Sequence, residues 1–181
     1  MPDVPGAPSA PHPWTPSRFA AAFREHRTPL VQYVLGIVGD GPAAHDLVQD
    51  TFADVWADGH DPSRPLRPLL FSMARNRALN HVRNRNTRSG KHDEIRNDSE
   101  IATLPTDTLD AAPLAERLAA WVRALPERQR EALTLTRFRG LSHTEAADVM
   151  GLSPRTVNNH LVRALATLRD RLAAFDPDLR L

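Results

Sequence analysis

Three side chains in the last quarter of the sequence carry the chemistry needed to recognise bases in a DNA groove. Arg155, Asn159 and Arg163 recur at steps of four residues, so a helix would place them in one row. In the major groove, arginine matches guanine and asparagine matches adenine through paired hydrogen bonds, each worth about 1–3 kcal/mol of discrimination. Polar rows also occur on the solvated faces of ordinary helical hairpins, so the surrounding residues must decide between the two interpretations.

Those surrounding residues predict a helix-turn-helix. Ser142 and Glu145 form the S-x-x-E pattern of a capping box, which satisfies the free amides in the first turn of a helix. Gly151 suits the positive φ that ends this helix, and Ser153 followed by Pro154 is typical of the start of the next one. The apolar residues of the second helix share one arc of about 100° opposite the polar row: Val157, Leu161, Ala164, Leu165, Leu168 and Leu172. This scaffold favours a second helix that enters the major groove of DNA.

The rest of the chain shows helical patterns interrupted by one long polar stretch. Apolar residues recur at helical spacing from Ser17, where Pro29 is expected to kink or break a helix, and again along residues 44–56 and 66–86. Residues 87–112 lose this periodicity and are rich in Thr, Asp, Ser and Asn, as in a flexible linker. We predict an all-α protein with two small helical domains joined by this linker, the second being a helix-turn-helix domain. The expected domain ranges are 17–86 and 113–175.

Both ends of the sequence are expected to be tails. The first sixteen residues include six prolines, which cannot sustain a helix or a central strand, so residues 1–16 are predicted to be a disordered Pro-rich tail. Trp14 lies in this tail and receives no role. Trp56 and Trp121 instead fall on apolar stripes and are expected in the core. Residues 176–181 form the second predicted tail.

Composition excludes several classes of protein. No run of 18 or more apolar residues suggests a membrane-spanning helix, and the absence of cysteine excludes disulfides and thiolate zinc sites within the sequence. The lack of cysteine also fits a reducing cytoplasm, which is the expected location. The eight histidines form no H-x-x-x-H pair, and the sequence contains neither G-x-S-x-G nor a glycine-rich phosphate loop. We therefore expect a protein that is not an enzyme and that needs neither a metal nor another cofactor.

The net charge of +1 conceals a segregation of charge along the chain. Residues 1–60 contain three basic and seven acidic side chains, whereas residues 61–96 contain nine basic and three acidic ones. Residues 113–181 are basic again, with eleven bases against eight acids. Of the 23 basic residues only Lys91 is a lysine, so guanidinium groups dominate any anion binding. The pattern predicts two separate surfaces for a polyanion.

Two sequence signatures, one in each helical block, are similar to those of a known family. The first block contains AHDLVQDTFADVW and FSMARNRALNHVR, and the second contains LPERQREALTLTRFRGLSHTEAADVMGLSPRTVNNHLVRALATLR. In this order and with a variable linker between them, they resemble the extracytoplasmic-function (ECF) sigma factors of bacterial RNA polymerase. The resemblance implies a sigma region 2 domain, a sigma region 4 domain and a role in promoter-specific initiation. It also implies three partners, namely core RNA polymerase, promoter DNA and an anti-sigma factor.

The family resemblance assigns the first domain to the polymerase and to the minus-ten promoter element. It implies that the DLVQD helix binds the clamp coiled coil of the polymerase's largest subunit through Asp46, Gln49 and Asp50. The loop DGHDPSRP and the following helix are assigned to the melted minus-ten element. Binding of single-stranded DNA needs cations and amide donors, and this helix supplies Arg75, Asn76, Arg77, Asn80 and Arg83. Either Arg75 or Arg77 could instead bridge to the acidic neighbouring helix.

The second domain is assigned to the minus-thirty-five element as a duplex. The resemblance implies that bases are read by Arg155, Thr156, Asn159 and Arg163, with Asn158 and His160 nearer to phosphate. Two residues of the first domain depart from the usual family pattern. His45 replaces the commoner glutamate, and Asn80 stands where aspartate is frequent. The first departure bears on the contact with polymerase and the second on the minus-ten sequence.

One alternative also accounts for the second block. The segment GLSPRTVNNHLVRALATL would suit the output domain of a LuxR-type helix-turn-helix transcriptional regulator. Such a regulator would carry a ligand-binding or phospho-receiver domain with alternating strands and helices before it. Residues 17–86 show only helical patterns, which favours the sigma factor.

Overall fold

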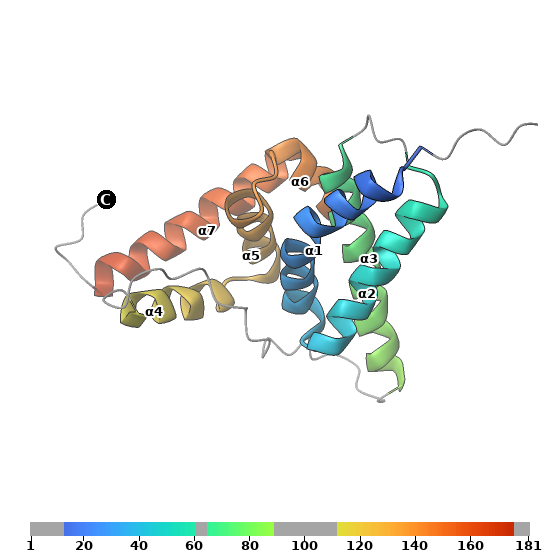
Figure 1. Cartoon of the computed structure of the whole chain (residues 1–181). Coiled ribbons are helices and arrows are strands. Elements are labelled where there is room, and N and C mark those ends of the chain that lie inside the picture. The colour runs from blue at the N-terminus through green and yellow to red at the C-terminus, as the bar shows by residue number, and fades with distance from the viewer. Residues whose placement is uncertain (1–12, 61–64, 89–111, 176–181) are drawn as a thin grey trace, which may run out of the picture.

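The protein is helical throughout the residues that its structure, a computed structural model, describes. These are residues 13–60, 65–88 and 112–175, and they contain no strand. The first domain consists of three helices, α1 (Pro16–Val38), α2 (Gly41–Ala57) and α3 (Leu66–Arg88). The second consists of α4 (Ala112–Arg123), α5 (Glu127–Leu133), a π-helix η2 (Thr134–Phe138), α6 (His143–Met150) and α7 (Pro154–Phe175) (Figure 1). The all-α prediction is confirmed, whereas most of the predicted linker and tails lie outside the described residues.

The first domain is a bundle in which each helix packs against the other two. The hydroxyl of Thr15 caps the first turn of α1, and Gly39, with a φ of 71°, ends the helix. The carboxylate of Asp40 then caps α2. Of the kink or break expected at Pro29, the break does not occur, because α1 continues through this residue as a single element. The bundle encloses a core of large apolar side chains from all three helices: Leu30, Val34, Val48, Phe52, Leu70 and Phe71.

The predicted amino-terminal tail extends less far than expected. Trp14 is only 5% exposed and packs edge-on against Phe19, with 5.9 Å between ring centroids. Phe19 in turn contacts the rings of Phe52 and Trp56 in α2. Burial of an indole ring stabilises a fold and offsets part of the entropy cost of ordering the short segment that carries it. Trp14 therefore belongs to the core of the first domain rather than to a disordered tail.

The second domain has the predicted helix-turn-helix as its centre. Glu145 donates its backbone N–H to the Ser142 hydroxyl and accepts the Ser142 backbone N–H on its carboxylate, so the capping box is complete. Gly151 adopts a φ of 65° and ends α6. The Ser153 hydroxyl accepts the Thr156 backbone N–H and caps α7. Both predicted helix starts and the predicted turn are therefore confirmed.

The two domains pack directly on each other, an arrangement that the sequence left open. Helix α6 lies against α3 (Figure 1). The apolar core of the first domain continues into the second, where it includes Leu135, Leu141 and the buried face of α6. A separate apolar cluster joins α4, α5 and α7 through Val122, Leu125, Leu133, Leu161 and Ala164. The helix-turn-helix thus lies between two cores, one of which it shares with the first domain.

None of the helices in the described ranges is long and apolar enough to cross a membrane.

Candidate nucleic-acid interface

The polar row on α7 is exposed as the sequence predicted. Arg155, Asn159 and Arg163 are all exposed on one side of the helix, while Val157, Leu161 and Ala164 are buried on the other. The remaining predicted residues flank the row: Asn158 is exposed, and Thr156 and His160 are half-buried. The Thr156 hydroxyl lies 2.8 Å from that of Ser153, within hydrogen-bonding distance. The row is therefore accessible to a duplex along its length.

Two apolar clusters determine the direction in which this row faces. Val157, at the start of α7, is buried in the core that extends from the first domain. Leu161 and Ala164, about one and two turns later, are buried in the cluster shared with α4 and α5. Because both clusters lie on the inner side of α7, the helix cannot rotate without exposing one of them. A rigid helix with an open polar face is the geometry required for a reader of base edges.

The acidic surface of α2 is also exposed. Asp46, Gln49 and Asp50 face solvent, whereas Val48 and Phe52 are buried in the bundle. His45, the residue that departs from the family pattern, lies beside this surface. Its Nδ1 is 3.2 Å from an Nη of Arg27 in α1.

The arginine and asparagine residues on α3 do not form one open row. Asn76, Asn80 and Arg83 are exposed, and the Arg83 guanidinium donates to the Asn80 side-chain oxygen at 3.2 Å. Arg77 is half-buried and donates to the carboxylate of Asp54 in α2. A second nitrogen of Arg77 lies 3.8 Å from the carboxylate of Asp50. Arg77, one of the residues predicted to bind minus-ten DNA, therefore pairs with α2, the helix predicted to bind polymerase. This is the bridge to the acidic neighbouring helix that the sequence offered as the alternative for Arg77.

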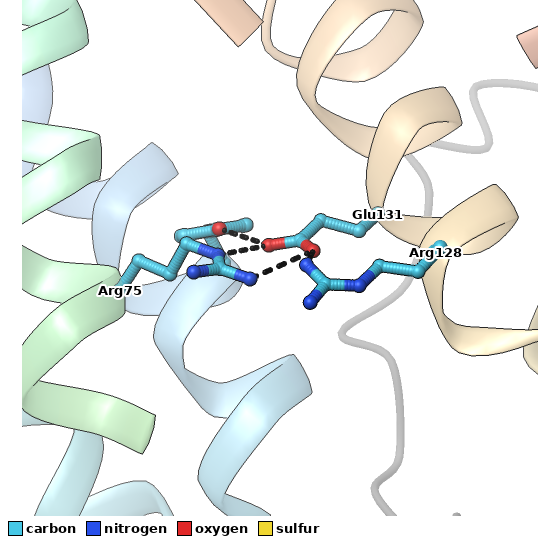
Figure 2. Close-up of polar contacts among 4 residues, drawn as sticks. Arg75, Arg128 and Glu131 are labelled. Carbon is cyan, nitrogen blue, oxygen red and sulfur yellow. Dashed lines mark hydrogen bonds and ion pairs between the residues drawn. The ribbon is translucent and has the colours of Figure 1, made fainter. Parts of the chain in front are cut away.

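Arg75, the first residue of the predicted minus-ten set, is buried between the two domains. Its Nε donates to Glu131 Oε1 at 2.6 Å and its Nη2 to Glu131 Oε2 at 3.3 Å (Figure 2). The Tyr33 hydroxyl donates to the same Oε1 at 2.9 Å, and Arg128 lies 3.5 Å from Oε2. The side chains of Arg75 and Glu131 are only 10% and 11% exposed. Three helices, α1, α3 and α5, meet at this carboxylate.

The surroundings of Glu131 favour the protonated forms of Tyr33 and Arg75, which are the forms that donate hydrogen bonds to it. Burial raises the pKa of the Tyr33 hydroxyl well above its usual value of 10.0, and the negative charge of Glu131 raises it further. Burial acts to lower the pKa of Arg75, but the hydrogen bond to Glu131 and the nearby negative charges together outweigh this effect, and the pKa is raised. Tyr33 therefore remains a neutral donor at physiological pH, and Arg75 remains a cation.

A second polar contact crosses between the domains. Arg139, which follows the π-helix, donates from Nη1 to the Gln32 side-chain oxygen in α1 at 2.8 Å. The backbone N–H of Arg139 bonds to the carbonyl of Thr134 at 2.9 Å, five residues earlier, so the wide turn of the π-helix leads directly into this contact. Burial lowers the pKa of the Arg139 guanidinium. Neither the π-helix nor the two polar contacts between the domains were predicted from the sequence.

Among the described residues, no group of three or more His, Cys, Asp or Glu side chains is arranged to hold a metal ion.

Comparison with known families matches both halves of the chain. A model for Sigma-70 region 2 matches residues 22–88, and a model for Sigma-70 region 4 matches residues 115–168. The RNA polymerase sigma factor CnrH of Cupriavidus metallidurans is 34% identical over 71% of this chain and 73% of its own length. The sigma factor NccH of Alcaligenes xylosoxydans is 32% identical over 83% of this chain and 84% of its own length.

Two solved structures have similar folds. CnrH in complex with the cytosolic domain of CnrY has a TM-score of 0.61 at 27% identity, covering 88% of this chain and 90% of CnrH. RpoE of Bartonella quintana in complex with the anti-sigma factor NepR has a TM-score of 0.67 at 25% identity. That match covers 85% of this chain and 96% of RpoE.

Proposed function

We propose that this chain, which belongs to the extracytoplasmic-function sigma factors of RNA polymerase, directs initiation by recognising one promoter element with each of its two helical domains. The exposed row on α7 is the observation that carries the assignment for the second domain. In this proposal Arg155, Thr156, Asn159 and Arg163 read the minus-thirty-five duplex, and Asn158 and His160 lie nearer to phosphate. Two guanidinium groups and an amide match the hydrogen-bonding edges of guanine and adenine.

The first domain is proposed to bind both the polymerase and the melted minus-ten element. Asp46, Gln49 and Asp50 form the polymerase-binding surface, which is supported by their exposure on one side of α2. The minus-ten strand is assigned to α3 through Arg75, Asn76, Arg77, Asn80 and Arg83. Of these, Asn76, Asn80 and Arg83 are exposed to a DNA strand in the present arrangement, whereas Arg75 and Arg77 first have to leave their carboxylate partners.

The proposed partners are core RNA polymerase, promoter DNA and an anti-sigma factor. An anti-sigma partner is supported by the solved relative RpoE, which was crystallised with the anti-sigma factor NepR. The chain would act in the cytoplasm, where the polymerase works. It would contribute no catalytic group, because the polymerase itself performs the synthesis of RNA.

The LuxR-type alternative has no support from the first domain. Residues 22–88 match sigma region 2, and the described residues in this range are helical or in short turns, without the strands that a receiver domain would need.

In vitro transcription tests this function directly. Core polymerase with and without the purified chain is supplied with a library of genomic DNA fragments, and the 5′ ends of the transcripts are sequenced. The proposal predicts a set of start sites that depends on the chain and shares two upstream sequence elements. An identical set of start sites with and without the chain would contradict it.

A further inference from the structure

The contact between the domains is built around one buried carboxylate. Glu131 belongs to the second domain, but Arg75 and Tyr33, which bind it, belong to the first. We call these three residues the interdomain latch. Hydrogen bonds between charged groups are stronger than neutral ones, and these lie at side chains that are largely shielded from water. The latch therefore favours the arrangement in which α6 lies on α3.

This closed arrangement does not fit simultaneous contact with both promoter elements. The minus-ten and minus-thirty-five positions lie about 25 base pairs apart, which is about 85 Å along DNA. Two domains of about 70 residues in contact span roughly 60 Å at most. The number of residues between α3 and α4 allows the domains to move apart by up to about 80 Å. A promoter-bound chain must therefore have separated domains.

The latch also occupies a residue of the proposed minus-ten surface. In the closed arrangement, Nε and Nη2 of Arg75 both donate to the carboxylate of Glu131. The Arg75 side chain is only 10% exposed. A DNA phosphate or base could reach it only after Glu131 has moved away. The carboxylate of Glu131 thus holds the position that an anionic nucleic acid would take.

We infer that the interdomain latch is an autoinhibitory contact: Glu131 holds the two domains together and withholds Arg75 from DNA until the domains separate. This inference rests on the proposed function. Arg155, Asn159 and Arg163 on α7 stay exposed in the closed arrangement, so the latch does not cover the residues proposed to read the minus-thirty-five element. It prevents both elements from being held at once.

The substitution Glu131→Gln tests the latch, because it removes the charge but retains the shape. Tyr33→Phe removes one hydroxyl and keeps the ring that packs on Phe71, so it serves as a second, milder variant. Glu116→Gln is the matched control, since it removes the same charge from an exposed position on α4. Small-angle X-ray scattering of the full chain reports on domain separation. Function is measured as transcription from one promoter fragment while the concentration of the chain is raised at a fixed concentration of core polymerase. The chain concentration for half-maximal transcription is the quantity compared.

Opening the latch is expected to increase the open fraction of the free chain. Glu131→Gln should raise the radius of gyration and lower the chain concentration for half-maximal transcription by on the order of tenfold, since only the open fraction is competent. Tyr33→Phe should shift both quantities in the same direction by less, and Glu116→Gln should match the wild type.

Two results would overturn the inference. An unchanged radius of gyration in both latch variants would show that the contact does not hold the domains together. Expansion without a change in the half-maximal concentration would show that closure does not inhibit. Absence of transcription with every variant and with the wild type would instead contradict the proposed function, and the inhibitory role would fall with it.

Discussion

Helices α3 and α7 both carry arginine and asparagine at helical spacing, yet they present these residues very differently. On α7 the row of Arg155, Asn159 and Arg163 is exposed, because both apolar clusters that hold the helix lie on its other side. Helix α3 packs against α1, α2 and α6. Two of its arginines, Arg75 and Arg77, are consequently held by carboxylates of α5 and α2. The number of neighbours around a helix therefore decides how much of its polar surface remains available.

The largest expected effect follows from removing both arginines of the α7 row. Arg155→Ala combined with Arg163→Ala should reduce transcription from promoters with the preferred minus-thirty-five sequence by on the order of a hundredfold or more, since each bidentate pair contributes about 1–3 kcal/mol. Core-polymerase binding should be unchanged. Promoter-specific transcription and a binding assay with core polymerase measure the two quantities.

A matched control for this pair is Arg169→Ala. Arg169 is exposed on the same helix but lies well beyond the first turns, which enter the groove in helix-turn-helix proteins. If Arg155→Ala lowered transcription equally on every upstream sequence, Arg155 would contact phosphates and would not recognise bases. The proposed difference between α7 and α3 would then be contradicted.

Arg75 should contribute to stability where Arg155 does not. Arg75→Ala leaves the buried Glu131 without its principal partner and should lower the free energy of unfolding by about 2–3 kcal/mol. Arg155→Ala removes an exposed side chain and should change it by less than about 0.5 kcal/mol. Chemical denaturation of both variants measures the difference, and equal stabilities would contradict the structural role of Arg75.

Reversal of one charge on α2 should affect polymerase binding and not promoter choice. Asp50→Arg is expected to weaken the affinity for core polymerase by about tenfold, because it reverses a charge within the surface that is proposed to bind the polymerase. Asp58→Arg makes the same reversal at the exposed end of α2, outside the proposed surface, and serves as the control. A pull-down titration with core polymerase distinguishes the two variants. Undiminished affinity of Asp50→Arg would place the polymerase-binding surface elsewhere.

The smallest effect concerns the ionisation of Tyr33, the only tyrosine in the chain. Its pKa in the folded protein is raised by burial and by Glu131, whereas the unfolded chain should ionise near 10.0. The contribution of Tyr33 to stability is thus fully present below that pH and is lost as the pH rises through the folded pKa. Tyrosinate absorbance should appear at higher pH in the folded chain than in denaturant. Coincident titrations would mean that Tyr33 is not held against Glu131.

Local rules predicted the parts of this fold that depend on neighbours in sequence. Ser142 and Glu145 are three residues apart, so their mutual capping can be recognised without knowledge of the fold. The same holds for Gly151 and for the apolar arc of α7. The exposed row could be predicted because α7 is amphipathic and one side of it alone is packed.

The remaining features depend on residues that are distant in sequence. Arg75 and Glu131 are 56 residues apart, and Tyr33 and Glu131 are 98 apart, so no spacing rule connects them. Trp14 lies among prolines that favour a tail, but it is buried against Phe19 of α1, whose ring packs on α2. Periodicity identified α3 as a helix but could not show that α6 would cover part of it.

The distance between the two domains tests the central claim most directly. The chain has no cysteine, so fluorophores can be attached to Ala21→Cys on α1 and Ala120→Cys on α4, both at exposed positions. Energy transfer should report one short distance in the free chain. In a transcribing complex with core polymerase and promoter DNA, the distance should increase by tens of ångströms, since the two promoter elements lie about 85 Å apart. The same short distance in both states would contradict the account.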